Sequence, residues 1–187
     1  MRLTPKLYAH PFSSYCQKAL VALYENDTPF DYVLLEGEAP QRELESLWPI
    51  GKFPVLVDGG NVVFEATCII EHLDLHHRGP VRFVPGGPES VEVRMLDRFF
   101  DNYVMTPMQE IVGDHLRPAG ARDPHGVAQA HALLDKAYAW LEQRLQGREW
   151  ACASGFGLAD CAAASSLFYA DWVHEIGTEQ RNLRDYR

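Results

Sequence analysis

A segment rich in proline and glycine divides this 187-residue chain into two parts; it covers residues 78–90 (RGPVRFVPGGPES). Before this segment, short apolar runs typical of strands alternate with helical patterns, and after it the pattern is helical throughout. A chain of this length holds one large domain or two small ones. We therefore predict an α/β domain over residues 1–80 and an all-helical domain over residues 88–187.

The pattern of the first part predicts seven segments in this order: a strand, a helix, a strand, a loop that includes a short helix, two strands and a helix. A helix joins the first two strands, which predicts that they are parallel. The tight turn Asp58-Gly59-Gly60-Asn61 joins the last two, which makes them antiparallel. The predicted strands are residues 3–9, 30–35, 53–57 and 62–64, and the predicted helices are residues 15–26 and 65–77. The result is a small mixed sheet with helices.

The second part predicts three longer helices, over residues 89–115, 124–146 and 157–173. Pro107 lies inside the first of them and should kink it. The tail, residues 179–187, is charged and compatible with a helix, and it ends without a glycine or proline stop. We expect from this tail that the chain lacks the last helix of its domain.

Composition excludes several classes of protein. Lys and Arg number 17 and Asp and Glu 26, so the net charge is −9, the reverse of the basic surplus of nucleic-acid binders. No apolar run approaches the 18 residues of a membrane span, and the N-terminus has no apolar stretch of signal-peptide length. The 4 cysteines form no CxxC pair. We predict a cytoplasmic protein that binds neither nucleic acid nor membrane.

Polar residues at the starts of two helices are candidates for binding an anion or a zwitterion. Ser13 lies at the start of helix 15–26, where free N–H groups and the helix dipole favour an anion, although this turn alone favours a plain N-cap serine by about two to one. Glu65 and Ala66 start helix 65–77, where a carboxylate beside free N–H groups suits an amino-acid head group; an ordinary acidic first turn is the alternative. Phe53-Pro54 enters a strand, where a cis bond would turn the Phe53 backbone toward a ligand.

Asp160 follows Gly157 by three positions, before an alanine-rich helix. A carboxylate at this position reaches back to the backbone N–H of the cap residue. We interpret Asp160 as a folding signal and not as a catalytic group.

Together these features resemble the glutathione transferase family over the whole chain. The N-terminal segments are LYAHPFSSYCQKALVAL and GKFPVLVDGGNVVFEATCIIEHLD, and the C-terminal segments are DRFFDNYVMTPMQEIV and FGLADCAAASSLFYADWV. The nearest resemblance is to bacterial, serine-type cytosolic members. It implies a thioredoxin-like α/β domain followed by an all-α domain, glutathione as co-substrate with no metal, a hydrophobic electrophile as second substrate, a role in detoxification, and a homodimer.

The resemblance also implies roles for individual residues. Ser13 donates a hydrogen bond to the glutathione sulfur and so favours the thiolate, which is the attacking group. Pro54 stands at the position of the family's cis-proline, so the backbone of Phe53 before it pairs with the cysteinyl part of glutathione, and Lys52 approaches the glycyl carboxylate. Glu65 meets the γ-glutamyl amine, and the N–H of Ala66 meets the γ-glutamyl carboxylate. The implied glutathione-binding residues are therefore Ser13, Lys52, Phe53, Pro54, Glu65 and Ala66.

Two positions depart from the family pattern. Most members have serine where Ala66 stands, and a lost hydroxyl contact costs about 1 kcal/mol, or about five- to tenfold in affinity, unless Thr67 compensates. The loop after the second strand often carries His or Lys for the glycyl end, and residues 38–41 here read EAPQ.

Other residues offer alternative or additional roles. Phe12, Tyr103 and Met108 are the candidates for the second-substrate pocket. Tyr8 is an alternative donor to the sulfur, although it is one residue out of place and so turns to the other face of its strand. Cys16 occupies the position of the second cysteine of a redox pair, which leaves a thiol oxidoreductase or peroxidase as an alternative. A further alternative is a binding protein that keeps the fold without turnover.

Three histidines near the end of helix 65–77 raise the question of a metal site. His72 and His76 are four residues apart on one helix, but the sequence has no HExxH motif and Glu71 precedes His72. We interpret His72, His76 and His77 as a solvated polar helix end and predict no metal site.

Overall fold

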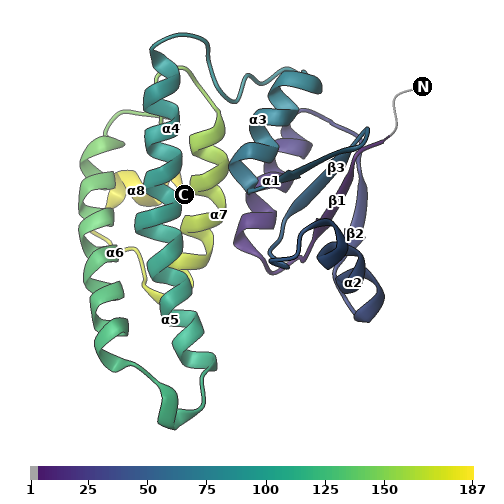
Figure 1. Cartoon of the computed structure of the whole chain (residues 1–187). Helices are drawn as coiled ribbons and strands as arrows, with labels where there is room; N and C mark the ends of the chain where they lie inside the picture. Colours follow the sequence, from purple (N-terminus) through teal and green to yellow (C-terminus); the bar gives the residue numbers. More distant parts are fainter. Residues whose placement is uncertain (1–3) are drawn as a thin grey trace. The chain divides into compact units, whose positions relative to one another are not determined.

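A computed structural model describes residues 4–187 of the chain. It divides into two compact units, the first ending at Pro85 and the second covering Gly86–Arg187. The division falls inside the proline- and glycine-rich segment. Figure 1 shows a sheet with helices in the first unit and helices alone in the second.

The first unit contains a four-stranded sheet in the order β2-β1-β3-β4. Strand β1 is parallel to β2 and antiparallel to β3, and β3 is antiparallel to β4. Gly59 and Gly60 join β3 to β4 with φ values of 56° and 94°, a region that glycine reaches without a steric penalty. The predicted mixed sheet and its hairpin are confirmed. The strands are β1 Lys6–Ala9, β2 Asp31–Leu34, β3 Val55–Asp58 and β4 Asn61–Phe64.

Helices cover both faces of this sheet: α1 Ser14–Glu25, α2 Glu38–Leu47 and α3 Ala66–His76. Leu7 and Leu56 face a core cluster with the apolar residues of α1 and α3. Tyr8 and Val55, next to them along their strands, face a second cluster that includes Leu44 of α2. Because side chains alternate along a strand, β1 and β3 each contribute to both clusters.

The second unit consists of helices connected by loops. Their bounds are α4 Glu89–Phe100, α5 Thr106–Leu116, α6 Pro124–Arg144, α7 Leu158–Val173 and α8 Arg181–Tyr186. A 3₁₀ turn, η2, covers Ala119–Ala121. The alanine-rich helix α7 is buried along most of its length, which small side chains permit. The predicted helices of this part are confirmed to within a few residues, including a helix in the charged tail.

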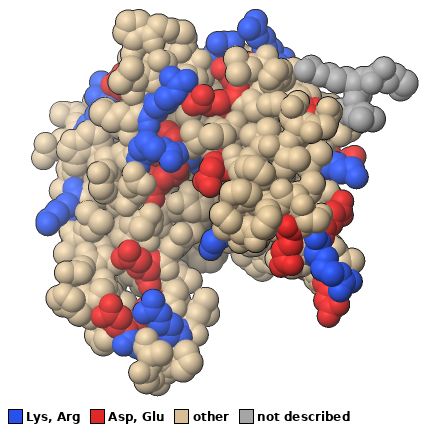
Figure 2. Space-filling model, viewed as in Figure 1, with Lys and Arg blue, Asp and Glu red and all other residues tan. Residues whose placement is uncertain are grey.

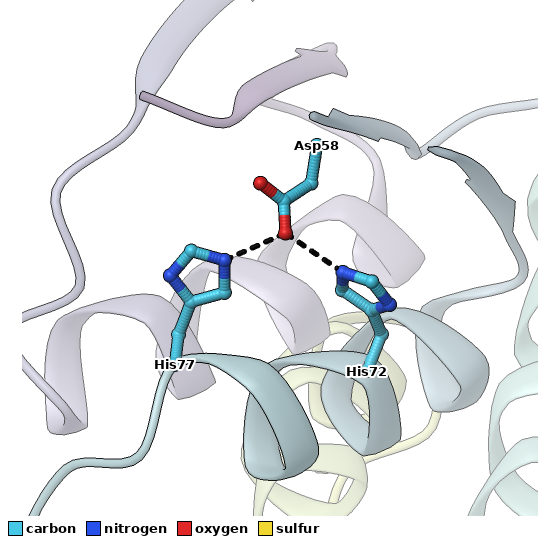
Figure 3. A group of neighbouring side chains, drawn as sticks. All are labelled: Asp58, His72 and His77. Atoms are coloured by element: carbon cyan, nitrogen blue, oxygen red, sulfur yellow. Dashed lines mark hydrogen bonds and ion pairs between the residues drawn. The ribbon is translucent and has the colours of Figure 1, made fainter. Parts of the chain in front are cut away.

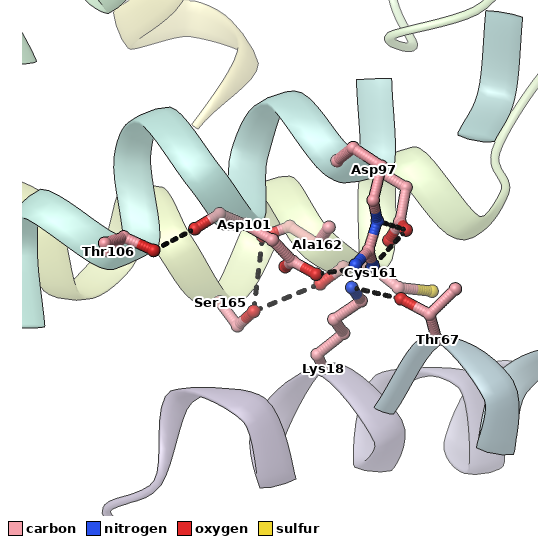
Figure 4. A network of polar contacts seen from close by, with 9 residues as sticks. Lys18, Thr67, Asp97, Asp101, Thr106, Cys161, Ala162 and Ser165 are labelled. Carbon is pink, nitrogen blue, oxygen red and sulfur yellow. Dashed lines mark hydrogen bonds and ion pairs between the residues drawn. The ribbon is translucent and has the colours of Figure 1, made fainter. Parts of the chain in front are cut away.

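A π-helical segment, η1 Asp101–Met105, lies between α4 and α5. Pro107 has no N–H to donate, and its ring clashes with the carbonyl four residues earlier in an α-helix. The Thr106 N–H donates to the Asp101 carbonyl five residues back, and the Thr106 hydroxyl donates to the same oxygen at 3.0 Å (Figure 4). The sequence predicted a kink at Pro107; the structure shows a local widening of the helix, the π-helical segment immediately before the proline.

Among residues 4–187, no helix is both long enough and apolar enough to cross a membrane. On the face in Figure 2, acidic and basic side chains are interspersed over α2, where Arg42 pairs with Glu38 at 2.9 Å.

Candidate functional site

The strand register brings three segments to one edge of the sheet. Tyr8 of β1 lies opposite Val55 of β3, and Val55 lies opposite Phe64 of β4. Because β3 runs against its two neighbours, the residues after Tyr8, before Val55 and after Phe64 reach the same edge. This edge carries the turn before α1, the Phe53-Pro54 dipeptide and the start of α3, which together include the candidates Ser13, Phe53, Pro54, Glu65 and Ala66.

Ser13 is the N-cap of α1. Its φ and ψ of −83° and 119° are extended, and its Oγ accepts a hydrogen bond from the Cys16 N–H at 3.3 Å. Its own N–H donates to the His10 carbonyl at 3.0 Å, which fixes the turn. The hydroxyl is half-buried and lies at the positive end of the helix dipole. An anionic sulfur beside this hydroxyl would gain both a donor and a favourable field.

The Phe53–Pro54 peptide bond is cis, as the family resemblance implies. Phe53 is half-buried and packs against both core clusters of the first unit. Its ring centroid lies 6.3 Å from that of His10, whose ring is in turn 5.7 Å from Phe12. Aromatic rings therefore join the turn before α1 to the cis-proline segment.

Glu65 has a strained backbone. Its φ is 64° with ψ at 124°, a region that costs a residue with a Cβ about 1–3 kcal/mol. Glu65 is exposed, and its side chain makes no capping hydrogen bond to α3. Strain of this kind persists where the surrounding structure holds it, and it concentrates at binding sites. The strained Glu65, which directly precedes α3, is therefore a candidate binding residue at the N-terminus of that helix.

Ala66, the first residue of α3, is only 3% exposed. The next residue, Thr67, accepts a hydrogen bond on its Oγ1 from the Nζ of Lys18 at 2.9 Å (Figure 4). This hydrogen bond directs the Thr67 hydroxyl toward Lys18 of α1, so it links α3 to α1 within the first unit. A substitute for the missing serine hydroxyl at Ala66 must therefore come from a rotated Thr67 or from another group.

Lys52 is exposed and directly precedes Phe53. The EAPQ stretch forms the first turn of α2, where the Gln41 amide donates to Glu45 at 3.2 Å. Lys52 is therefore the basic residue that is the candidate for binding the glycyl carboxylate, since it directly precedes Phe53 at this edge of the sheet.

The two alternative sulfur-activating groups have other surroundings. The Tyr8 hydroxyl donates to Glu43 Oε1 at 2.6 Å, and burial together with Glu43 raises the pKa of Tyr8 to about 12. Tyr8 packs in the cluster on the α2 face, opposite to the face that α1 covers. Cys16 is 0% exposed; burial raises the pKa of its thiol, although hydrogen bonds involving Ser13 and the His10 backbone act in the other direction.

His10 is a site residue that sequence reasoning missed. Its carbonyl accepts from Ser13, its Nδ1 accepts from the Phe12 N–H at 3.3 Å, and its ring faces Phe53. The available signal was its position between the first strand and Ser13.

A pocket of about 230 Å³ lies in the second unit. Tyr103 lines it, with the residues Met95, Leu96, Arg98, Phe99, Asn102 and Trp140. Met108 is buried in the helical core, and Phe12, in the first unit, is 81% exposed. The second-substrate role of Phe12, Tyr103 and Met108 stays a prediction.

Comparison with known proteins identifies the class. Residues 7–81 match the family model of the glutathione S-transferase N-terminal domain, and residues 124–185 match that of the C-terminal domain. A small thioredoxin-like α/β domain followed by a helical domain is the architecture of this class. The chain belongs to the glutathione S-transferase family.

Individual relatives cover most of the chain. FtsZ-localized protein A of Caulobacter vibrioides is 29% identical over 185 residues, covering 94% of this chain and 81% of that protein. Glutathione S-transferase F6 of Arabidopsis thaliana is 31% identical, covering 97% of this chain and 88% of that protein. A glutathione S-transferase structure from Methylobacillus flagellatus, solved with GSH bound, has a TM-score of 0.86 at 25% identity and covers 98% of this chain and 92% of that chain.

Proposed function

We propose that this protein is a serine-type glutathione transferase, in which Ser13 holds glutathione as the thiolate for attack on a hydrophobic electrophile. The observation that carries the proposal is the common sheet edge. It gathers a hydroxyl at a helix N-terminus, a cis-proline segment and an exposed carboxylate beside a second helix N-terminus. Each suits one part of a tripeptide with a thiol and a zwitterionic head.

The proposed binding mode assigns each part of glutathione to a segment. The Phe53 backbone, next to Pro54, pairs with the cysteinyl residue as a short added strand. The γ-glutamyl amine meets Glu65, and its carboxylate meets the Ala66 N–H at the start of α3. Lys52 faces the glycyl carboxylate. The relative from Methylobacillus flagellatus, solved with GSH bound, supports glutathione as the ligand.

Ser13 acts as a donor and not as a nucleophile. A thiol has an unperturbed pKa of about 8.5, so most of it is protonated at neutral pH. A hydrogen bond from Ser13 Oγ and the dipole of α1 both favour the sulfur anion. A lowering of about two units, worth about 2.7 kcal/mol, makes most bound glutathione reactive. The thiolate then forms a bond to an electrophilic carbon as the leaving group departs.

The decisive experiment measures the thiol pKa of bound glutathione, by thiolate absorbance, in wild type, Ser13→Gly and Ser13→Thr. Glycine caps a helix almost as well as serine, so Ser13→Gly removes the hydroxyl with little effect on α1. We expect the bound thiol pKa to rise in Ser13→Gly by up to about two units, less the part that the remaining α1 dipole supplies. Turnover of an activated aryl halide at pH 7 should fall about 10- to 100-fold, and Ser13→Thr should retain most of both. An unchanged pKa in Ser13→Gly would refute the role of Ser13.

A glutathione-binding protein without turnover is the second candidate. Its support is the similarity to FtsZ-localized protein A, whose name records a location and not a reaction, together with Ala66 in place of the family's serine. Saturable glutathione binding without a lowered thiol pKa, and without turnover of several electrophile classes, favours this candidate.

An oxidoreductase that uses Cys16 has less support. Reactive cysteines are partly exposed and have lowered pKa values, whereas Cys16 is enclosed in the core and its pKa is raised. Activity that survives in Cys16→Ser and is lost in Ser13→Gly excludes this alternative.

We also propose that the protein is a cytoplasmic homodimer with a role in detoxification. Family resemblance supports the dimer and the role. The cysteines Cys16, Cys68, Cys152 and Cys161 are all free thiols, which suits a reducing compartment. Light scattering at micromolar concentration tests the dimer, since it reports twice the 21.2 kDa mass of the chain.

A further inference from the structure

Three side chains that ligate metals meet where strand β3 ends beside the C-terminus of α3. Asp58 is the last residue of β3, His72 lies within α3, and His77 directly follows α3. The Nε2 atoms of His72 and His77 lie 2.9 and 2.7 Å from the same atom, Oδ2 of Asp58. Figure 3 shows both imidazoles directed at this carboxylate.

The backbone at the end of α3 makes this convergence possible. Five positions along a continuous helix place two side chains about 140° apart around its axis. His77 leaves the helix with φ of −128° and ψ of 60°, and this turn brings its ring back toward Asp58. The expected solvated helix end is therefore wrong for His72 and His77, whose side chains are 12% and 11% exposed. It holds for the exposed His76.

We propose that Asp58, His72 and His77 bind a divalent transition-metal ion of the zinc type. Two imidazole nitrogens and one carboxylate oxygen form a recurrent ligand set for such ions, with water in the fourth position. The three ligand atoms lie within 4.8 Å of one another. Tetrahedral bonds of about 2.0–2.2 Å place ligand atoms about 3.3–3.6 Å apart, so side-chain rotations that move these atoms by about an ångström complete the site.

The charges and protons of the cluster suit a cation. The Asp58 carboxylate supplies a negative charge that offsets part of the charge of the ion. Each imidazole presents its Nε2 lone pair to the metal, so the proton that Nε2 shares with Asp58 moves to Nδ1 of the same ring or to solvent. The Asp58 side chain is 7% exposed, so the cluster is largely enclosed but open to a small ion and a water molecule.

A bound ion would replace two hydrogen bonds by three coordinate bonds between β3 and the end of α3. A ligand that binds only the folded state raises its stability in proportion to the logarithm of ligand concentration over Kd. The site therefore acts as a metal clamp on the first unit, on residues different from those proposed to bind glutathione.

The test uses the full-length chain without a histidine tag, freed of metal with a chelator and kept free of glutathione, whose thiol binds zinc. Zn²⁺ is titrated by calorimetry and by thermal melting, and Co²⁺ by its visible absorption. We expect one ion per chain and a rise in Tm. His77→Gln and Asp58→Asn should weaken binding about 100-fold or more. His125→Gln, at an exposed histidine of α6 in the second unit, is the control and should bind as wild type does, whereas the ring of His76 packs 4.4 Å from that of His72.

Two results would overturn the proposal. One is the lack of saturable binding up to about 1 mM Zn²⁺. The other is equal affinity in His125→Gln and His77→Gln, which places the ion elsewhere. If His77→Gln and Asp58→Asn do not fold, the wild-type imidazole NMR signals decide. Zinc must shift those of His72 and His77 more than those of His115 and His125, and equal shifts refute the site.

Discussion

Two helix N-termini, one in each unit, have opposite surroundings. At the start of α7, the carboxylate of Asp160, a residue 4% exposed, accepts three hydrogen bonds from the Gly157 N–H at 2.9 Å, the Ala151 N–H at 2.8 Å and the Tyr186 hydroxyl at 2.7 Å. At the start of α1, the half-buried Ser13 accepts one, from the Cys16 N–H at 3.3 Å.

The difference indicates that the α7 terminus stabilises the fold, whereas the α1 terminus is suited to binding a ligand. Burial raises the pKa of Asp160, and its three hydrogen bonds offset only part of this rise. The carboxylate is therefore enclosed, and its hydrogen-bonding capacity is used within the fold. At the N-terminus of α1, the hydroxyl of the half-buried Ser13 accepts one long hydrogen bond, from the Cys16 N–H at 3.3 Å. The N-terminus of α3 differs from that of α7 in another way, because its N-cap residue, Glu65, has a strained backbone and makes no side-chain capping hydrogen bond. Helix ends that the protein does not fully satisfy are available to a ligand.

Removing the carboxylate at the α7 terminus should have the largest effect. Asp160→Ala leaves two buried N–H groups and the Tyr186 hydroxyl without their acceptor, and we expect a loss of about 3–5 kcal/mol in the free energy of unfolding. Urea unfolding measures it, with the exposed Asp185→Ala as control, expected within about 0.5 kcal/mol of wild type. A loss below 1 kcal/mol would mean that Asp160 is not the main determinant of this terminus.

Tyr8 and Glu43 form a second tyrosine–carboxylate pair, like Tyr186 and Asp160. Its contribution to stability can be measured through the pH dependence of the free energy of unfolding. The folded-state pKa of Tyr8 is about 12 against an ordinary 10.0, so the unfolded chain releases its proton first. The stability due to this shift is present below pH 10 and is lost as the pH rises from 10 to 12, by up to about 2.7 kcal/mol.

Tyr8→Phe should therefore flatten the fall in unfolding free energy over pH 10–12. Chemical unfolding at each pH measures it, and Tyr24→Phe, at an exposed tyrosine, should keep the wild-type slope. Equal slopes in wild type and Tyr8→Phe would show that the Tyr8 pKa is not raised by folding.

The α3 terminus should gain affinity from a restored hydroxyl. Ala66→Ser adds a donor beside the proposed γ-glutamyl carboxylate, and we expect glutathione to bind about five- to tenfold more tightly. Calorimetry measures the Kd, with Cys68→Ser, an exposed position on the same helical turn, as control. No gain in Ala66→Ser would mean that the carboxylate does not lie at this position.

The smallest effect concerns the cap of α1. Ser13→Ala should lower the free energy of unfolding by about 1 kcal/mol, and Ser13→Gly by only a few tenths, because glycine leaves the cap backbone free and solvated. Urea unfolding of both variants measures this. A loss near that of Asp160→Ala would make Ser13 a structural residue, contrary to the comparison of the two termini.

Local patterns in the sequence determined most of the elements. The hairpin follows from Gly59 and Gly60, which reach positive φ without cost, and the α7 terminus follows from the carboxylate three positions after Gly157. The strands and helices follow from hydrophobic periods that differ between the two parts of the chain. The family resemblance added the candidate site residues and the cis bond before Pro54.

Only the tertiary structure decided which distant side chains meet. Tyr8 bonds to Glu43, Thr67 bonds to Lys18, and His72 and His77 both bond to Asp58. These hydrogen bonds join residues 14 to 49 positions apart in the sequence. The spacing of His72 and His76 accounts for the 4.4 Å between their ring centroids, but it could not show that His77 reaches Asp58, because the chain turns out of α3 at His77. Local pattern governs backbone conformation residue by residue, whereas these contacts depend on the strand order β2-β1-β3-β4 and on how each helix packs against the sheet.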